Sequence, residues 1–120
     1  MSKQYMLVVV DNLRHVREFF NASHFDLLNR ELLHTANSKS YRLATEYKEV
    51  RFIYYDVAAI DSIRGTHYTQ AIITQYSDEY SQKLVLSRLR GKGERMFQVG
   101  YKDMWEVVGL VNKFLGVSDE

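Results

Sequence analysis

The run that decides the fold is Tyr5–Val10, which reads Tyr-Met-Leu-Val-Val-Val near the start of a 120-residue chain. A short, continuous run rich in β-branched residues is typical of a strand buried on both faces of a sheet. Asp11 or Asn12 follows where the N-cap of a helix belongs. Apolar residues then recur at helical spacing over residues 13–20. The pattern therefore predicts a strand followed by a helix that packs back onto it.

Strand-like and helix-like segments alternate from this unit to the end of the chain. The pattern predicts a second helical stretch at 23–36, paired strands at 41–46 and 49–55, a short helix or turn at 57–63, a strand at 70–75, a helix at 77–90, a strand at 95–99 and a last helix from 104. Such alternation implies a mainly parallel sheet with helices on both faces. We therefore expect an α/β fold: a single three-layer domain, residues 1–120, with a mainly parallel sheet of about five strands flanked by helices.

Particular side chains are expected to carry this packing. Phe25 lies on the apolar face of the second helical stretch, and Tyr80 and Leu84 do so in the helix at 77–90. In the last helix, Trp105 is expected to pack onto the sheet together with Met104, Val107, Val108 and Val111, which recur on one helical face.

Composition excludes several classes of function. The chain has no cysteine, so a disulfide framework, a thiolate metal site and a cysteine nucleophile are all ruled out. No glycine precedes Gly65, so the first strand leads into neither a Walker loop nor a dinucleotide-binding turn. The formal net charge of +1 produces no strong global field. The N-terminus has no signal-like apolar core, and we expect a cytoplasmic protein with no membrane segment.

The order of the segments resembles the P-loop ATPase core of the terminase and helicase type. Tyr5–Val10 with its polar turn and helix is similar to the unit after Walker A. The stretch Tyr41–Tyr55 and the step Ile63-Arg64-Gly65 resemble the hairpin and "RG" element before Walker B. Ala71–Gln75 then stands at the Walker B strand. The segment from Ser77 to Gly100 resembles the helix and strand that follow, so the likeness covers about residues 5–100.

The departures from that family concern its chemistry. Walker A is missing, and Thr74 or Gln75 stands where the metal-binding aspartate belongs. Magnesium and a γ-phosphate would have no ligands here. The resemblance therefore implies a P-loop-like fold and a nucleic-acid setting without ATPase activity, and a phage origin would suit such a reduced relative.

The most uneven charge lies between residues 83 and 102, where six basic residues and one acid give a local net charge of +5. Guanidinium groups beside glycine backbone amides suit phosphate, and an adjacent tyrosine offers a stacking face. The alternative is a solvated helix end, where cations favour the helix dipole. With the loop arginine included, the predicted nucleic-acid or partner surface comprises Arg64, Lys83, Arg88, Arg90, Lys92, Arg95 and Tyr101.

Other polar groups have simpler interpretations. Asp78 and Glu79 suit the first turn of a helix, where carboxylates interact with its dipole. Asp56 follows a predicted strand and is placed to point into a cleft at the edge of the sheet. The four histidines include no pair four residues apart, so no helical zinc site is expected. No catalytic residue, metal or cofactor is predicted.

These observations lead to a non-catalytic protein that binds nucleic acid or a nucleic-acid-processing machine. Two alternatives stay open. One is a protein-interaction module, because tyrosine and arginine are favoured at interfaces. It would be a regulator, an inhibitor of a host protein or a structural subunit that forms homo-oligomers. The other is an ATPase fragment that borrows its P-loop from a second chain.

Overall fold

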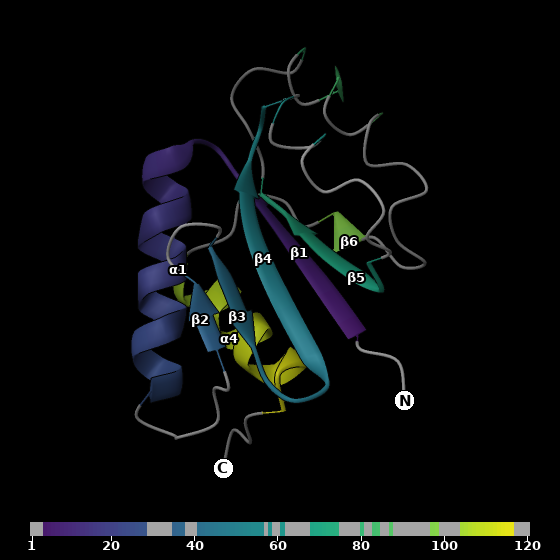
Figure 1. Cartoon of the computed structure of the whole chain (residues 1–120). Coiled ribbons are helices and arrows are strands. Elements are labelled where there is room, and N and C mark those ends of the chain that lie inside the picture. The colour runs from purple at the N-terminus through teal and green to yellow at the C-terminus, as the bar shows by residue number, and fades with distance from the viewer. Residues whose placement is uncertain are drawn as a thin grey trace.

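The structure is a computed structural model that describes residues 4–28, 35–37, 41–56, 68–74, 97–98 and 104–116, with the single positions 58, 61, 80, 83, 84 and 87. Within these residues, six strands form one sheet in the order β2-β3-β4-β1-β5-β6 (Figure 1). The strands are β1 (Gln4–Val10), β2 (Thr35–Asn37), β3 (Arg42–Ala44), β4 (Lys48–Tyr54), β5 (Gln70–Ile73) and β6 (Phe97–Gln98), and the two continuous helices are α1 (Leu13–Leu28) and α4 (Met104–Phe114).

The sheet is mixed. β1 pairs in parallel with both β4 and β5, and β5 pairs in parallel with β6. β2, β3 and β4 are joined by antiparallel pairing. β1 is therefore a central strand, and its last five residues are all buried, as its unbroken apolar run predicts.

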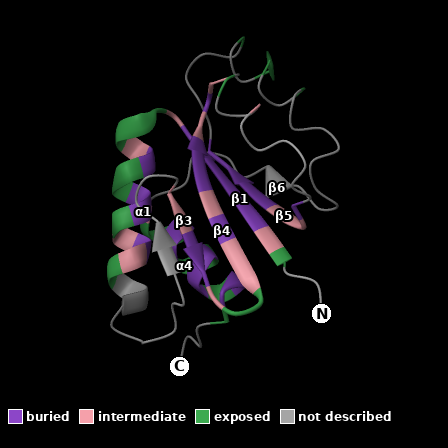
Figure 2. Ribbon diagram, in the orientation of Figure 1, coloured by how far each residue is buried: buried purple, intermediate pink, exposed green. Residues whose placement is uncertain are grey.

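One face of the sheet packs against both α1 and α4. Val8 and Phe52 from the sheet meet Phe20 from α1 and Val111 from α4 in one buried cluster (Figure 2). Burying each such side chain contributes about 1.5–3 kcal/mol. Phe20 also lies edge-on to Phe52, with ring centroids 6.0 Å apart. This cluster fixes the position of both helices on the sheet.

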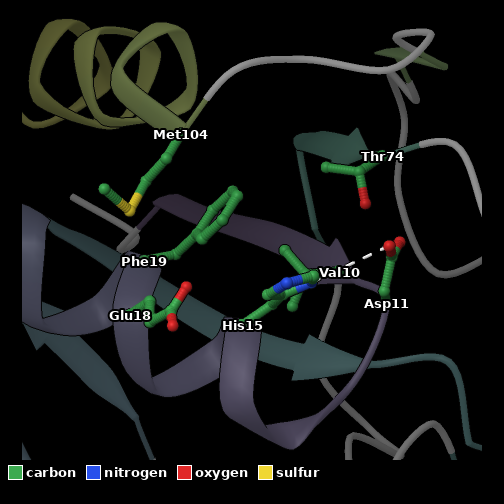
Figure 3. A pocket seen from close by; sticks show the side chains of 7 residues that line it. All are labelled: Val10, Asp11, His15, Glu18, Phe19, Thr74 and Met104. Carbon is green, nitrogen blue, oxygen red and sulfur yellow. Dashed lines mark ion pairs between the residues drawn. The ribbon is translucent and has the colours of Figure 1, made fainter.

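The C-terminal end of α4 is tied to the start of β4. Lys48 Nζ donates a hydrogen bond to the Phe114 carbonyl oxygen at 2.8 Å and lies over the Phe114 ring, 5.3 Å from its centroid. A cation at this end of a helix satisfies a terminal carbonyl and favours the helix dipole. Met104, the first residue of α4, lies at the other end of the strands, beside the carboxyl end of β1 (Figure 3).

The opposite face is buried as well. Leu7, Val9, Ile53 and Ile73 form a second cluster, and Leu7 and Val9 are completely buried. Tyr68 and Tyr5 extend this cluster in an edge-to-face contact with centroids 6.3 Å apart. Burial on both faces explains why alternate residues of β1 are equally apolar.

The predicted α/β class is correct, but the finer architecture is not. The sheet is mixed and six-stranded in the described residues, whereas a mainly parallel sheet of about five strands was expected. The predicted hairpin forms as β3 and β4, and its antiparallel pairing continues into β2. The second helical stretch expected at 23–36 is not a separate helix: residues 23–28 are helical but belong to α1, residues 29–34 lie outside the described residues, and Thr35–Asn37 is a strand. α1 and α4 lie on the same face, so among the described elements the three-layer arrangement is not seen.

Several side chains predicted to pack are exposed instead. Trp105 is 65% exposed, although Val107, Val108 and Val111 of the same helix are buried as expected. Phe25 is 71% exposed and Tyr80 76% exposed, and Leu84 is also at the surface. Each lies within a helical apolar pattern, but in α1 and α4 the packed face is narrower than the apolar pattern of the sequence.

The order of the strands makes one end of the central strand β1 special. After β1 the chain passes through α1, β2 and β3 to reach β4 on one side, and then crosses to β5 on the other. The carboxyl end of β1 is therefore a topological switch point, the place where open α/β sheets bind ligands.

Candidate functional site

A pocket of about 210 Å³ opens at the carboxyl end of β1. It is larger than the cavity of about 150 Å³ that accommodates benzene in an engineered protein. Figure 3 shows Phe19 and Met104 together on one side, with Thr74 and Asp11 on the other. The side chains that line the pocket are Val10, Asp11, His15, Glu18, Phe19, Thr74 and Met104.

The strand-to-helix junction positions the polar residues. Asn12 caps α1, because its Oδ1 accepts a hydrogen bond from the His15 backbone N–H at 3.0 Å. The cap directs the helix so that His15, Glu18 and Phe19, three and four residues apart, share one face. Asp11 immediately precedes the cap, and its Oδ2 lies 3.7 Å from His15 Nδ1. This ion pair forms when the imidazole is protonated.

The carboxylate of Asp11 is only partly satisfied. Its Oδ1 atom is buried and accepts no hydrogen bond from any residue that the structure describes. A buried acceptor without a donor costs about 1–3 kcal/mol, and more when it is charged. Glu18 differs, because its Oε1 lies 3.1 Å from the Nε of Arg14, whose side chain is largely exposed. One carboxylate oxygen of a pocket-lining residue is therefore removed from water and still able to accept a hydrogen bond.

Tyr55 and Thr74 follow the strands on either side of β1, and of the two only Thr74 lines the pocket. The Thr74 backbone N–H and Oγ1 both donate to the Val9 carbonyl oxygen, at 3.0 and 3.1 Å. The Tyr55 hydroxyl donates in turn to the Thr74 carbonyl oxygen. Burial raises the pKa of Tyr55 well above its ordinary value of 10.0, and the negative charge of Asp11 raises it further. The charge of Asp11 therefore reaches the hydroxyl at the end of the neighbouring strand.

The chemistry offered is that of an acceptor site with an apolar wall. Two carboxylates and an imidazole line the pocket together with Phe19, which is buried, and Met104. Among the described residues, no group of three or more His, Asp or Glu side chains is arranged to hold a metal ion. Such a pocket suits an organic group that donates hydrogen bonds and carries positive charge.

Most of the residues predicted from the sequence to form a binding surface lie outside the residues that the structure describes. Lys83 is exposed on a helical segment. The remaining members, Arg64, Arg88, Arg90, Lys92, Arg95 and Tyr101, lie outside the residues that the structure describes, as do Asp78 and Glu79.

Asp56, expected to point into an edge cleft, does not line the pocket. Its Oδ1 accepts a hydrogen bond from the Ala58 backbone N–H at 3.0 Å, a local turn contact. The site residues that sequence reasoning missed are Asp11, His15 and Glu18. Their signal was available: a carboxylate at the end of a buried strand, followed by polar side chains at helical spacing.

No helix in the described part of the chain has the length and apolar character needed to cross a membrane. In comparisons with known proteins, no family model, curated protein or solved structure matched this chain. The resemblance to terminase and helicase-type ATPases therefore stays a prediction, and a functional conclusion depends on the geometry of the site.

Proposed function

We propose that this chain is a non-catalytic binding protein whose pocket at the carboxyl end of β1 takes a small ligand bearing a protonated amine or guanidinium group. The observation that carries the proposal is the buried Oδ1 of Asp11, a residue that lines the switch-point pocket: this oxygen has no hydrogen-bond donor among the described residues. A hydrogen bond to a charged group contributes about 1.5–3 kcal/mol, so a cationic donor is the ligand group that gains most there.

The rest of the pocket supports the same chemistry. Phe19 and Met104 offer an apolar surface for the stem or ring that carries the cation, and an aromatic face also attracts positive charge. Phosphate is disfavoured, because Asp11 and Glu18 would repel it and the β1–α1 junction has no glycine loop. A ligand with a positive head and an apolar body matches both walls.

The test compares benzylammonium with benzyl alcohol, which has the same ring and no charge. Thermal unfolding is followed for the parent, for Asp11→Asn and for Glu46→Gln, which removes an exposed carboxylate in the β3–β4 turn. A ligand that binds only the folded state raises the melting temperature. At a ligand concentration of 100 times the Kd, the added free energy of unfolding is about 2.7 kcal/mol. We expect benzylammonium to stabilise the parent and Glu46→Gln but not Asp11→Asn, and benzyl alcohol to act on none of them.

Equal stabilisation of the parent and Asp11→Asn would refute the proposal. Stabilisation by magnesium chloride alone, lost in Asp11→Asn, would replace the amine with a divalent cation.

Nucleic acid is a second candidate ligand, at a different surface. Tyr80, Lys83 and Leu84 are exposed at helical spacing three and four residues apart, which places a ring and a cation on one face of a helix. A base can stack on such a ring while the lysine contacts phosphate. Binding to single-stranded DNA that weakens steeply with salt would support this candidate, and binding that is insensitive to salt would count against it.

A further inference from the structure

Two arginines lie side by side on the face of the sheet opposite α1 and α4. Arg42 in β3 is the register partner of Arg51 in β4. Hydrogen-bonded pairs lie on both sides of this position. The Thr45 N–H donates to the Lys48 carbonyl oxygen three residue pairs away, and the Phe52 N–H donates to the Tyr41 carbonyl oxygen one pair away on the other side. In an antiparallel ladder, hydrogen-bonded and non-hydrogen-bonded pairs alternate. The two arginines therefore form a non-hydrogen-bonded antiparallel pair, the position at which opposing side chains approach most closely.

Their face of the sheet follows from the alternation of the strand. Val50 and Phe52, on either side of Arg51, belong to the cluster that packs against α1 and α4. Arg51 and its partner Arg42 therefore point the other way, toward the side of β3 and β4 that is turned to the viewer in Figure 1. Both residues are only partly buried, so their guanidinium groups are within reach of a ligand.

Placing like charges directly opposite one another destabilises a sheet. The Nε atom of Arg42 is buried and has no hydrogen-bond acceptor, and no carboxylate of the described residues forms an ion pair with it. Arg42 therefore carries two unfavourable features together: a cationic neighbour and a desolvated donor. Both are relieved by an anion that contacts the two arginines at once.

The surroundings show where such an anion would lie. The charges of Arg51, Glu49 and Arg42 all act on the hydroxyl of Tyr68, and Arg51 also hydrogen-bonds it. These charged side chains therefore lie near the buried Tyr68. One glutamate against two arginines leaves a net positive charge there.

We propose that Arg42 and Arg51 form a binding site for a phosphomonoester group. A guanidinium offers a fixed fork of N–H donors that matches phosphate oxygens in pairs. A carboxylate has two oxygens and is satisfied by one fork, whereas a phosphomonoester has three terminal oxygens and close to two negative charges, enough for two forks. The site has the opposite charge preference to the pocket at the end of β1 and lies on the other side of the sheet, so it does not depend on the function proposed for that pocket.

The experiment uses inorganic phosphate as the first probe, at constant ionic strength set with potassium chloride. In the parent, phosphate should raise the melting temperature and move the Nε–Hε signals of Arg42 and Arg51 along one saturation curve in nitrogen–proton spectra. Arg42→Gln should abolish the phosphate effect. It should also melt no lower than the parent in phosphate-free buffer, because it removes the repulsion between the arginines. Arg14→Gln, the same change at an exposed arginine of α1, should behave as the parent.

A second pair of probes separates the sources of the phosphate. A thymidine oligonucleotide with a 5′-phosphate should bind about ten-fold more tightly than the same strand with a 5′-hydroxyl, the equivalent of one added charge-assisted hydrogen bond. Equal binding of the two strands would overturn the monoester. Parent arginine signals that do not respond to phosphate, or an Arg42→Gln protein that is less stable without phosphate, would overturn the site itself.

Discussion

Replacing Tyr55 with phenylalanine tests the hydrogen bond that joins the residues following β4 and β5, beside the switch-point pocket. The side chain is 8% exposed, and its hydroxyl donates to the Thr74 carbonyl oxygen. Phenylalanine keeps the ring and removes the donor. One such hydrogen bond contributes about 0.5–1.5 kcal/mol, and leaving a buried carbonyl with one partner fewer adds to the loss. At pH 7 we expect Tyr55→Phe to lower the free energy of unfolding by about 1–2 kcal/mol. The melting temperature should fall by roughly 4 °C for each kcal/mol lost.

The same variant should behave differently at alkaline pH. The pKa of Tyr55 is raised in the folded state above 10.0, its ordinary value, by burial and by the charge of Asp11. The stability that its neutral hydroxyl contributes is therefore complete below pH 10 and is lost as the pH rises toward the folded pKa. In that range each pH unit removes about 1.4 kcal/mol from the parent and nothing from the phenylalanine variant. By pH 11 the advantage of the parent should be close to zero.

Urea unfolding followed by far-ultraviolet circular dichroism at pH 7, 9, 10 and 11 measures this convergence. Tyr47→Phe serves as the matched control, because Tyr47 is 49% exposed in the β3–β4 turn. The other tyrosines are common to parent and variant, so their ionisation cancels in the difference. A stability difference between parent and Tyr55→Phe that stays constant from pH 7 to 11 would refute the reasoning.

Further predictions concern packing and binding. Phe20→Leu should lower the free energy of unfolding by about 1–2 kcal/mol, because it removes the edge-to-face ring pairs. Phe25→Leu, at an exposed position, should change the free energy of unfolding by less than about 0.5 kcal/mol. Equal effects of the two variants in thermal melts would contradict the packing described. Truncation before Asp103 removes α4 and should abolish the cooperative transition, and an unchanged melting curve would show that α4 is dispensable. The purified chain should neither bind nor hydrolyse ATP, and magnesium-dependent phosphate release would contradict this. Changing Arg88, Arg90 and Lys92 of the predicted basic surface together to glutamate should leave the melting temperature unchanged and weaken binding to nucleic acid or an acidic partner. For nucleic acid, the salt dependence of binding should also flatten by roughly 0.9 in slope for each phosphate that is no longer neutralised. Unchanged affinity would dismiss that surface.

Local sequence determined the elements whose signal is contained in one segment. The apolar run Tyr5–Val10 needed no partner to be recognised, because only a strand covered on both faces tolerates it. The cap at Asp11 or Asn12, which the structure assigns to Asn12, and the apolar stripe of α4 were equally local, since capping and helical periodicity depend on residues three or four apart. Asp11, His15 and Glu18 belong to this category too, although their meaning as a group depended on the pocket.

Only the tertiary structure decided the rest. Thr35–Asn37 forms a strand because it pairs with β3, and three residues carry too little pattern to predict this. Thr74 and Met104 reach the pocket from distant segments, through the crossover to β5 and the anchoring of α4 by Lys48. The pairing of Arg42 with Arg51 likewise exists only in one register of β3 on β4. The physical reason is common to all three: strand pairing and helix docking bring together residues whose separation along the chain leaves no periodic trace in the sequence.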